Sequence, residues 1–143
     1  MTGRDEADKA NTERDTIGEW RRQAGIMRRR LHPDTGAPTL SSNPMAALDP
    51  EFASLVNDFA LGGVYASEEL DLKSRALCTV AALVAAGEEA YARNWMDNAL
   101  NVGATPQELV ALLRQLFFYI GTPRCVRGFA ALHAVLEQRG SVQ

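Results

Sequence analysis

Residues 99–108 read Ala-Leu-Asn-Val-Gly-Ala-Thr-Pro-Gln-Glu, and this stretch decides the fold class. Gly103 is typical of the position just after a helix, because glycine readily takes the left-handed backbone conformation found there. Thr105 and Glu108 have the spacing of a capping box, in which each side chain accepts a hydrogen bond from the other residue's backbone N–H. Pro106 stands at the first helical position, where a missing N–H is tolerated. The stretch therefore predicts one helix ending before Gly103 and another beginning at Pro106.

The same signals recur on both sides of this stretch. Asp49-Pro50 predicts the start of a helix that runs toward Gly62-Gly63. Asp71 is placed to cap the next helix, which ends at Gly87, and Thr122-Pro123 begins the last one. No strand-like alternation bounded by turns appears in the sequence. We therefore predict an all-α protein, a compact bundle of about six helices.

The N-terminal third differs in character from the rest. Residues 1–11 are polar and are predicted to be disordered, whereas residues 12–31 carry apolar side chains at helical spacing. Residues 32–48 contain three prolines, which predicts a loop. Such a loop is long for a compact domain, so we expect it to wrap over a pocket or a neighbour. The predicted division is thus an N-terminal helix with its Pro-rich loop over 12–48, and a helical domain over 49–139.

Composition excludes several classes of protein. The net charge of −3 lacks the basic surplus of a nucleic-acid binder, and no apolar run is long enough to span a membrane. The N-terminal residues lack the apolar stretch of a secretory signal, so we expect a cytoplasmic protein with reduced thiols. Cys78 and Cys125 form no CxxC motif, and neither histidine has a metal-ligand partner at helical spacing. We predict neither a metal site nor a cofactor.

A series of short motifs, in a fixed order and spacing, is similar to one known family. The motifs are Phe59-Ala60-x-Gly62, Leu70-Asp71-x-Lys73-x-Arg75, Ala81-Ala82-Leu83, Ala99-Leu100-Asn101-x-Gly103-x-Thr105-x-x-Glu108, and Tyr119-x-Gly121-x-Pro123 before Phe129. Over roughly residues 50–137 the chain resembles the carboxymuconolactone decarboxylase family. The resemblance implies an alkyl hydroperoxidase D-like fold that forms homo-oligomers, trimers or hexamers, with active sites at or near subunit contacts.

The resemblance also implies two chemistries. Hydroperoxide reduction needs a CxxC pair followed by histidine, and the matching stretch, residues 88–95, contains no cysteine. Peroxidase activity is therefore not expected. Decarboxylation of a lactone acid needs no cofactor, but the positions where the resemblance implies a histidine and a glutamate hold Trp95 and Gly63. Arg75 and Tyr119 match family positions, and Arg127 stands where the family has asparagine.

Three residues are predicted to be catalytic. Arg75 would grip a substrate carboxylate or enolate through its planar guanidinium, although a structural ion pair is the alternative. Tyr119 would donate a phenolic hydrogen bond to a developing oxyanion. His133 would move a proton, because its ordinary pKa lies near neutrality, although a histidine on an apolar helix face is also typical of a core or interface position.

Five further residues are predicted to bind substrate. Arg124 and Arg127 lie three apart near the start of the last helix and would attract an anion, or would form a solvated or intersubunit salt-bridge face. Trp95 would reshape the pocket for a flat substrate. Tyr65 and Asn98 would donate hydrogen bonds to it, with core or surface roles as the alternatives.

These residues predict a cofactor-independent lyase or isomerase. Its substrate would be a small anionic, cyclic, oxygenated molecule, its reaction a decarboxylation, a cyclisation or a double-bond shift, and its setting specialised metabolite biosynthesis. The alternative is a non-catalytic ligand-binding or scaffold protein that keeps the fold.

Overall fold

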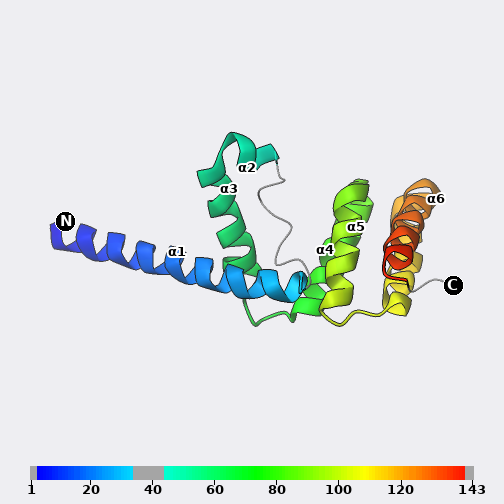
Figure 1. Ribbon diagram of the computed structural model, residues 1–143, viewed down its shortest axis with the longest axis horizontal. Helices are drawn as coiled ribbons and strands as arrows, with labels where there is room; N and C mark the ends of the chain where they lie inside the picture. Colours follow the sequence, from blue (N-terminus) through cyan, green and yellow to red (C-terminus); the bar gives the residue numbers. More distant parts are fainter. Residues whose placement is uncertain (1–2, 34–43, 141–143) are drawn as a thin grey trace. The chain divides into compact units, whose positions relative to one another are not determined.

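The computed structural model describes residues 3–33 and 44–140, with side chains from residue 15 onward. Within these ranges every regular element is a helix, which confirms the predicted all-α class (Figure 1). The chain divides into two units, residues 1–69 and 70–143. The first holds α1 (Gly3–Leu31), α2 (Pro44–Leu48), α3 (Pro50–Asn57) and the π-helix η2 (Asp58–Tyr65), and the second holds α4 (Leu72–Ala86), α5 (Glu89–Asn101) and α6 (Pro106–Gln138).

The N-terminal region differs from the prediction at two places. The helix α1 begins at Gly3, so residues 3–11 are helical where we predicted disorder. Alanine, glutamate and lysine, which favour helix, occur in this segment. Residues 34–43 of the predicted wrapping loop lie outside the described residues. Its last part is not a loop, because Pro44–Leu48 forms α2, with proline at the first helical position.

In the first unit, α1 packs directly against η2 at Gly62. A Cβ built on Gly62 would lie 1.8 Å from the backbone oxygen of Trp20, so only glycine allows this approach. The rings of Trp20 and Phe59 stack at a tilt with their centroids 5.2 Å apart. Arg21 Nε donates to Oδ2 of the buried Asp58 at 3.0 Å. These contacts join η2 to α1, and α3 in turn contacts η2. The two units divide after residue 69, and the predicted domain ranges 12–48 and 49–139 stay a prediction.

The second unit is built around α4, which contacts both α5 and α6. Its start and end are as predicted: Asp71 Oδ1 accepts from the Ser74 backbone N–H at 3.0 Å, and Gly87 ends the helix at φ 85°. The three helices share one core of mostly small and aliphatic side chains, which comprises Ala76, Val80, Val84, Ala92, Met96, Ala99, Ala104, Leu109, Leu113, Ala131, Leu132 and Val135.

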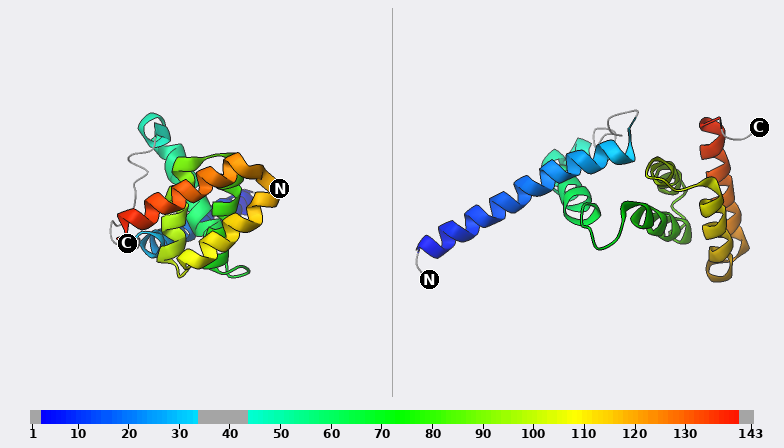
Figure 2. Two further views of the ribbon diagram at one scale, coloured as in Figure 1. Left: turned by 90° about the vertical axis from the view of Figure 1, so that its right-hand side faces the viewer. Right: turned by 90° about the horizontal axis from the view of Figure 1, so that it is seen from below.

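The helix α6 consists of two arms that meet at Gly121. This residue has φ 75° and ψ 170°, a left-handed backbone that confirms the predicted break. The two arms lie side by side (Figures 1 and 2). Cys125 Sγ on the second arm lies 3.5 Å from the Leu113 carbonyl oxygen on the first. Cys125 is buried, whereas Cys78 is exposed on α4.

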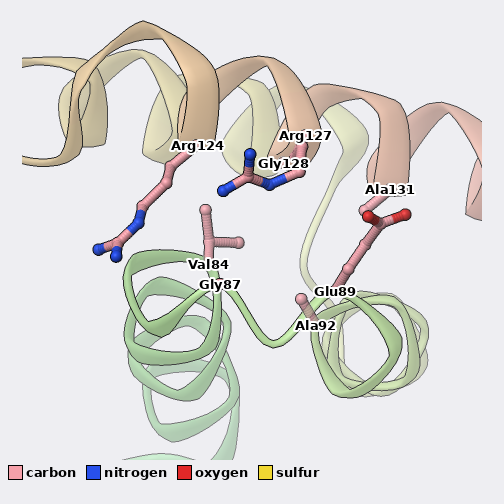
Figure 3. Close-up of a pocket in the computed structure, with 8 residues that line it drawn as sticks. All are labelled: Val84, Gly87, Glu89, Ala92, Arg124, Arg127, Gly128 and Ala131. Carbon is pink, nitrogen blue, oxygen red and sulfur yellow. The ribbon is translucent and has the colours of Figure 1, made fainter.

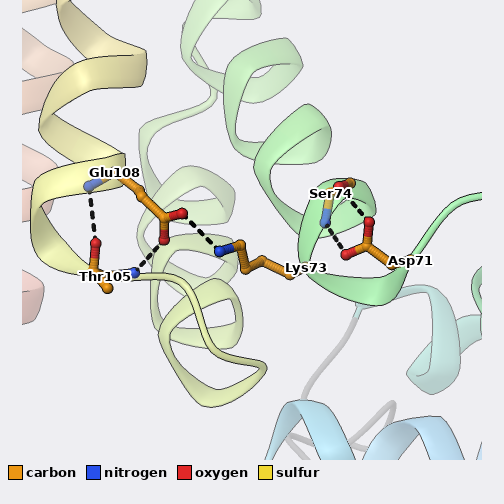
Figure 4. Close-up of polar contacts among 5 residues, drawn as sticks. All are labelled: Asp71, Lys73, Ser74, Thr105 and Glu108. Carbon is orange, nitrogen blue, oxygen red and sulfur yellow. Dashed lines mark hydrogen bonds and ion pairs between the residues drawn. The ribbon is translucent and has the colours of Figure 1, made fainter.

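The predicted capping box at the start of α6 is present and joins a wider network (Figure 4). Glu108 Oε2 accepts from the Thr105 backbone N–H at 2.8 Å, and Oε1 accepts from Lys73 Nζ of α4 at 2.6 Å. The hydrogen bond from Lys73, followed by that from Thr105, lowers the pKa of Glu108 below its ordinary value. The box therefore links α6 to the first turn of α4.

This network predicts a pH-dependent contribution to stability. Because folding lowers the pKa of Glu108, its stabilisation is complete above the ordinary glutamate pKa of about 4.3 and is lost as the pH falls through the folded value. We expect Glu108→Gln to be less stable than the wild type at neutral pH, with a gap that closes in acid. Urea unfolding at neutral pH and in steps to about pH 3 measures this gap. A gap of constant size would contradict the assignment, and Lys73→Met should remove most of the same pH dependence.

Candidate functional site

A small pocket in the second unit brings together the two arginines predicted from the start of the last helix (Figure 3). Its lining residues come from the end of α4, the start of α5 and the second arm of α6, and they are Val84, Gly87, Glu89, Ala92, Arg124, Arg127, Gly128 and Ala131. The pocket is half open to solvent and its volume is about 10 Å³, which is room for about one water molecule. A larger ligand would therefore lie on the apolar floor and extend along the exposed arginine side chains.

The close approach of α6 to α4 forms this floor. A Cβ on Gly128 would lie 2.8 Å from Leu113 Cδ2 and 3.1 Å from Val84 Cγ1, so glycine lets the second arm of α6 pack over Val84. Val84 and Ala131 belong to the buried core of the unit. The site is therefore a polar rim on a rigid apolar base.

Arg124 and Arg127 differ in how they are held. Arg124 Nη1 donates to the Ala85 carbonyl oxygen at 2.6 Å, one of the carbonyls that lack a helical partner at the end of α4. A cation is favourable there because of the helix dipole. Arg127 makes no hydrogen bond or ion pair with any residue that the structure describes. Arg124 is thus anchored by the fold, whereas the Arg127 guanidinium has its donors available.

Glu89 is the lining residue that the sequence reasoning missed. Its Oε1 accepts from Arg93 Nη2 at 2.9 Å, and its Oε2 has no partner within residues 3–33 and 44–140. Figure 3 shows the side chain rising from α5 toward Ala131, while both arginines extend over Val84. One signal pointed to it: Glu89 lies in the stretch 88–95, where the resemblance places the reactive groups of the family.

The three predicted catalytic residues lie elsewhere. Arg75 is in the first turn of α4, where its Nε donates to the Leu70 carbonyl oxygen at 2.9 Å. Gly87 lies twelve positions further along the chain, at the other end of α4, a distance of about 18 Å. Tyr119 is exposed near the end of the first arm of α6. His133 lies on the second arm, with Nδ1 3.4 Å from Glu137 Oε2.

His133 faces a different hollow from that of the arginines. It borders an open groove of about 460 Å³ whose other lining residues are apolar or small, namely Val110, Val126, Phe129, Ala130, Leu132 and Leu136. Neither Arg75 nor Tyr119 lines this groove. The structure of the single chain therefore does not gather the predicted catalytic residues into one pocket.

The remaining predicted residues belong to packed regions. Trp95 is partly buried against the core of the second unit. Asn98 is 1% exposed in that unit, and its Oδ1 has no hydrogen-bond partner among the described residues. Tyr65 is the last residue of η2, in the first unit. None of the three lines the arginine pocket.

The surroundings of Gly63 leave little space for the glutamate that the resemblance implies at this position. A Cβ at this position would lie 3.1 Å from both the Trp20 indole and the Phe59 ring. The space that a side chain would need is thus already bordered by two aromatic rings. A glutamate here would require Trp20 to move.

Two further features concern only the described parts of the chain. No cluster of three His, Cys, Asp or Glu side chains there is arranged to hold a metal ion. No helix there combines the length and the apolarity that crossing a bilayer requires.

Two comparisons with known proteins give a match to this chain. The sequence profile described as the carboxymuconolactone decarboxylase family matches residues 50–134. A curated relative, the 4-carboxymuconolactone decarboxylase of Acinetobacter baylyi (strain ATCC 33305 / BD413 / ADP1), is 32% identical over 87 residues. The match covers 61% of this chain and 63% of the relative. The residues that line the arginine pocket, 84–131, all fall within the matched profile.

Proposed function

The chain belongs to the carboxymuconolactone decarboxylase family, and on that premise we propose that it is a cofactor-independent enzyme of the lyase or isomerase type. Its substrate would be a small, anionic, cyclic and oxygenated molecule. The observation that carries the proposal is the pair Arg124 and Arg127 over an apolar floor, beside the stretch 88–95. The changes at Gly63 and Trp95 support a substrate other than that of the relative, and we place the reaction in specialised metabolite biosynthesis.

In such a decarboxylation the main contribution of the protein is positive charge near the reacting oxygen. When a carboxyl group leaves as carbon dioxide, the carbon–carbon bond breaks and its electron pair moves onto the conjugated carbonyl oxygen as an enolate. A proton then adds to carbon. Preorganised N–H donors aimed at that oxygen stabilise the transition state, and they act more strongly over an apolar floor than in water. The available guanidinium of Arg127 suits this role, and Arg124 adds positive potential from a fixed position.

The proposal is tested by a turnover assay with 4-carboxymuconolactone and related cyclic acids. The protein is incubated with each acid without added cofactor and in the presence of a metal chelator, and the products are identified by mass spectrometry. We expect a product that has lost carbon dioxide or has isomerised. Recovery of every acid unchanged would contradict an enzymatic role of this type.

A non-catalytic ligand-binding or scaffold role is the second candidate. It is favoured by the aromatic rings of Trp20 and Phe59 around Gly63, and by Trp95 packed into the core, because the resemblance implies proton-transfer groups at positions 63 and 95. In the same assay this role predicts an acid that binds tightly and is recovered intact.

We also propose that the chain forms a homo-oligomer, a trimer or hexamer. Large apolar side chains support this, since Phe118 is 84% exposed, Tyr119 is 78% exposed, and Val126 and Phe129 border the open groove beside His133. A partner subunit on this surface would bury them. The catalytic roles of Arg75, Tyr119 and His133 stay predictions within such an assembly.

A further inference from the structure

We infer that the arginine pocket takes a hydroxy acid, with its anionic group on Arg127 and a hydroxyl group at the other end donating to Glu89. The inference rests on the proposed function, because the site is the same, and it adds the substrate class. Three features carry it: an available cation, an available acceptor, and an apolar floor between them (Figure 3).

The anionic end follows from the arginines. In the part of the chain that the structure describes, no carboxylate lies within ion-pair distance of Arg127. Arg124 donates one of its N–H groups to a neutral carbonyl oxygen. Each guanidinium carries five N–H donors and no acceptor, so most of the donors on this rim lack a protein partner. A carboxylate matches a guanidinium fork in shape and charge. The pocket therefore selects an acid.

The hydroxyl end follows from Glu89. An ionised carboxylate only accepts hydrogen bonds, so a ligand that satisfies Oε2 must bring a donor. The charge of Glu89 is already balanced by Arg93 at 2.9 Å, and two more arginines line the same pocket. Cations around the site disfavour an ammonium group on the ligand. A neutral hydroxyl is the donor that fits.

The middle of the ligand must be apolar. Val84, Ala92, Gly128 and Ala131 form the floor between the arginines and Glu89, and they offer no polar side-chain atom. A polar group over this floor would lose its hydration without gaining a partner. The ligand class is thus an acid and a hydroxyl separated by a short apolar body, such as a ring.

The test compares two probes that differ by one hydroxyl group. Binding of 4-hydroxybenzoate and of benzoate is measured by isothermal titration calorimetry. We expect the wild type to bind 4-hydroxybenzoate about tenfold to 100-fold more tightly, the range for a hydrogen bond to a charged group. In Glu89→Ala the two probes should bind equally. Glu89→Gln keeps an acceptor oxygen and should retain part of the preference, which guards against a loss caused by misfolding.

The binding results can overturn either the hydroxy-acid inference or the proposed site. Equal affinity for the two probes in the wild type would overturn the hydroxy-acid inference and leave the acid-binding pocket standing. Tighter binding of 4-(aminomethyl)benzoate than of 4-hydroxybenzoate would also overturn it, in favour of an ammonium ligand. If Arg127→Gln bound both acids as well as the wild type does, or if neither acid bound to the wild type, the proposed site itself would be wrong. Arg114→Gln, on the other arm of α6, is the matched control and should change neither affinity.

Discussion

Substitution of Arg127 by glutamine is expected to lower kcat/KM for the acid substrate by about 100-fold to 1,000-fold, the effect of removing one donor that stabilises an oxyanion. Glutamine keeps a polar side chain but removes the charge and the guanidinium fork. Because Arg127 makes no contact with a charged group among the described residues, the substitution breaks no ion pair, and stability should hardly change. The assay is the turnover measurement described above, with thermal unfolding as the check on the fold.

The matched control is Arg114→Gln. Arg114 is an exposed arginine on the first arm of the same helix and does not line the pocket. The two variants lose the same charge, so a general effect of net charge on an anionic substrate would lower both rates alike. We expect the rate of Arg114→Gln to match that of the wild type. Equal rates for the Arg127 variant and its control would contradict the proposed role of Arg127.

Arg124 should behave differently from Arg127. Its substitution also leaves the Ala85 carbonyl without its donor, so Arg124→Gln should lose stability as well as activity. Loss of stability in the Arg124 variant alone would show that Arg124 also stabilises the fold, whereas Arg127 serves only to bind the ligand.

Substitution of Gly62 by alanine is expected to be the most destabilising change in the first unit. The added Cβ would lie 1.8 Å from the Trp20 backbone oxygen, and backbone cannot turn aside as a flexible side chain can. The helices α1 and η2 must move apart, with a cost of about 3 kcal/mol, at the upper end of the usual range for overpacking. Urea unfolding followed by circular dichroism measures the loss.

The control for Gly62 is Gly18→Ala on α1. A Cβ on Gly18 meets nothing within 4 Å, so alanine there should stabilise the helix by about 0.5–1 kcal/mol. If the two variants proved equally stable, the close contact between α1 and η2 would not exist in solution.

The local parts of the fold could be predicted because they depend on short stretches of sequence. Asp49, Asp71 and Thr105 each cap a helix as their spacing predicts, and Gly87 and Gly121 each take the left-handed backbone. Such signals act over three or four residues. They place helix ends without any knowledge of tertiary contacts.

The parts that could not be predicted depend on contacts between distant residues. The packing of η2 against α1 depends on Gly62 meeting Trp20, forty-two positions away in sequence. Cys78 has an apolar neighbourhood in sequence, yet it is exposed on α4. Periodicity shows which faces are apolar but not which of them another helix will cover.

The residues of the candidate site could likewise be predicted only where they depend on local sequence. Arg124 and Arg127 were predicted to act together because they are three apart on one helix, and the structure places them in one pocket. Glu89 was missed because it reaches that pocket only through the bend at Gly121 and the close packing at Gly128, which bring α6 over the turn between α4 and α5. Arg75 was predicted from the resemblance, and the length of α4 separates it from this pocket.

The most direct test of the arginine pocket as the ligand site is to map where a small cyclic acid binds. Isotopically labelled protein is titrated with benzoate, and the Nε–H signals of the arginines and the backbone amide signals are followed by NMR. Binding in the arginine pocket should cause saturable shifts at Arg124, Arg127 and the amides of Gly87 and Ala92, and these shifts should be lost in Arg127→Gln. Shifts confined to Arg75, or to the groove of Val126, Phe129 and His133, with the arginine pocket unperturbed, would contradict it.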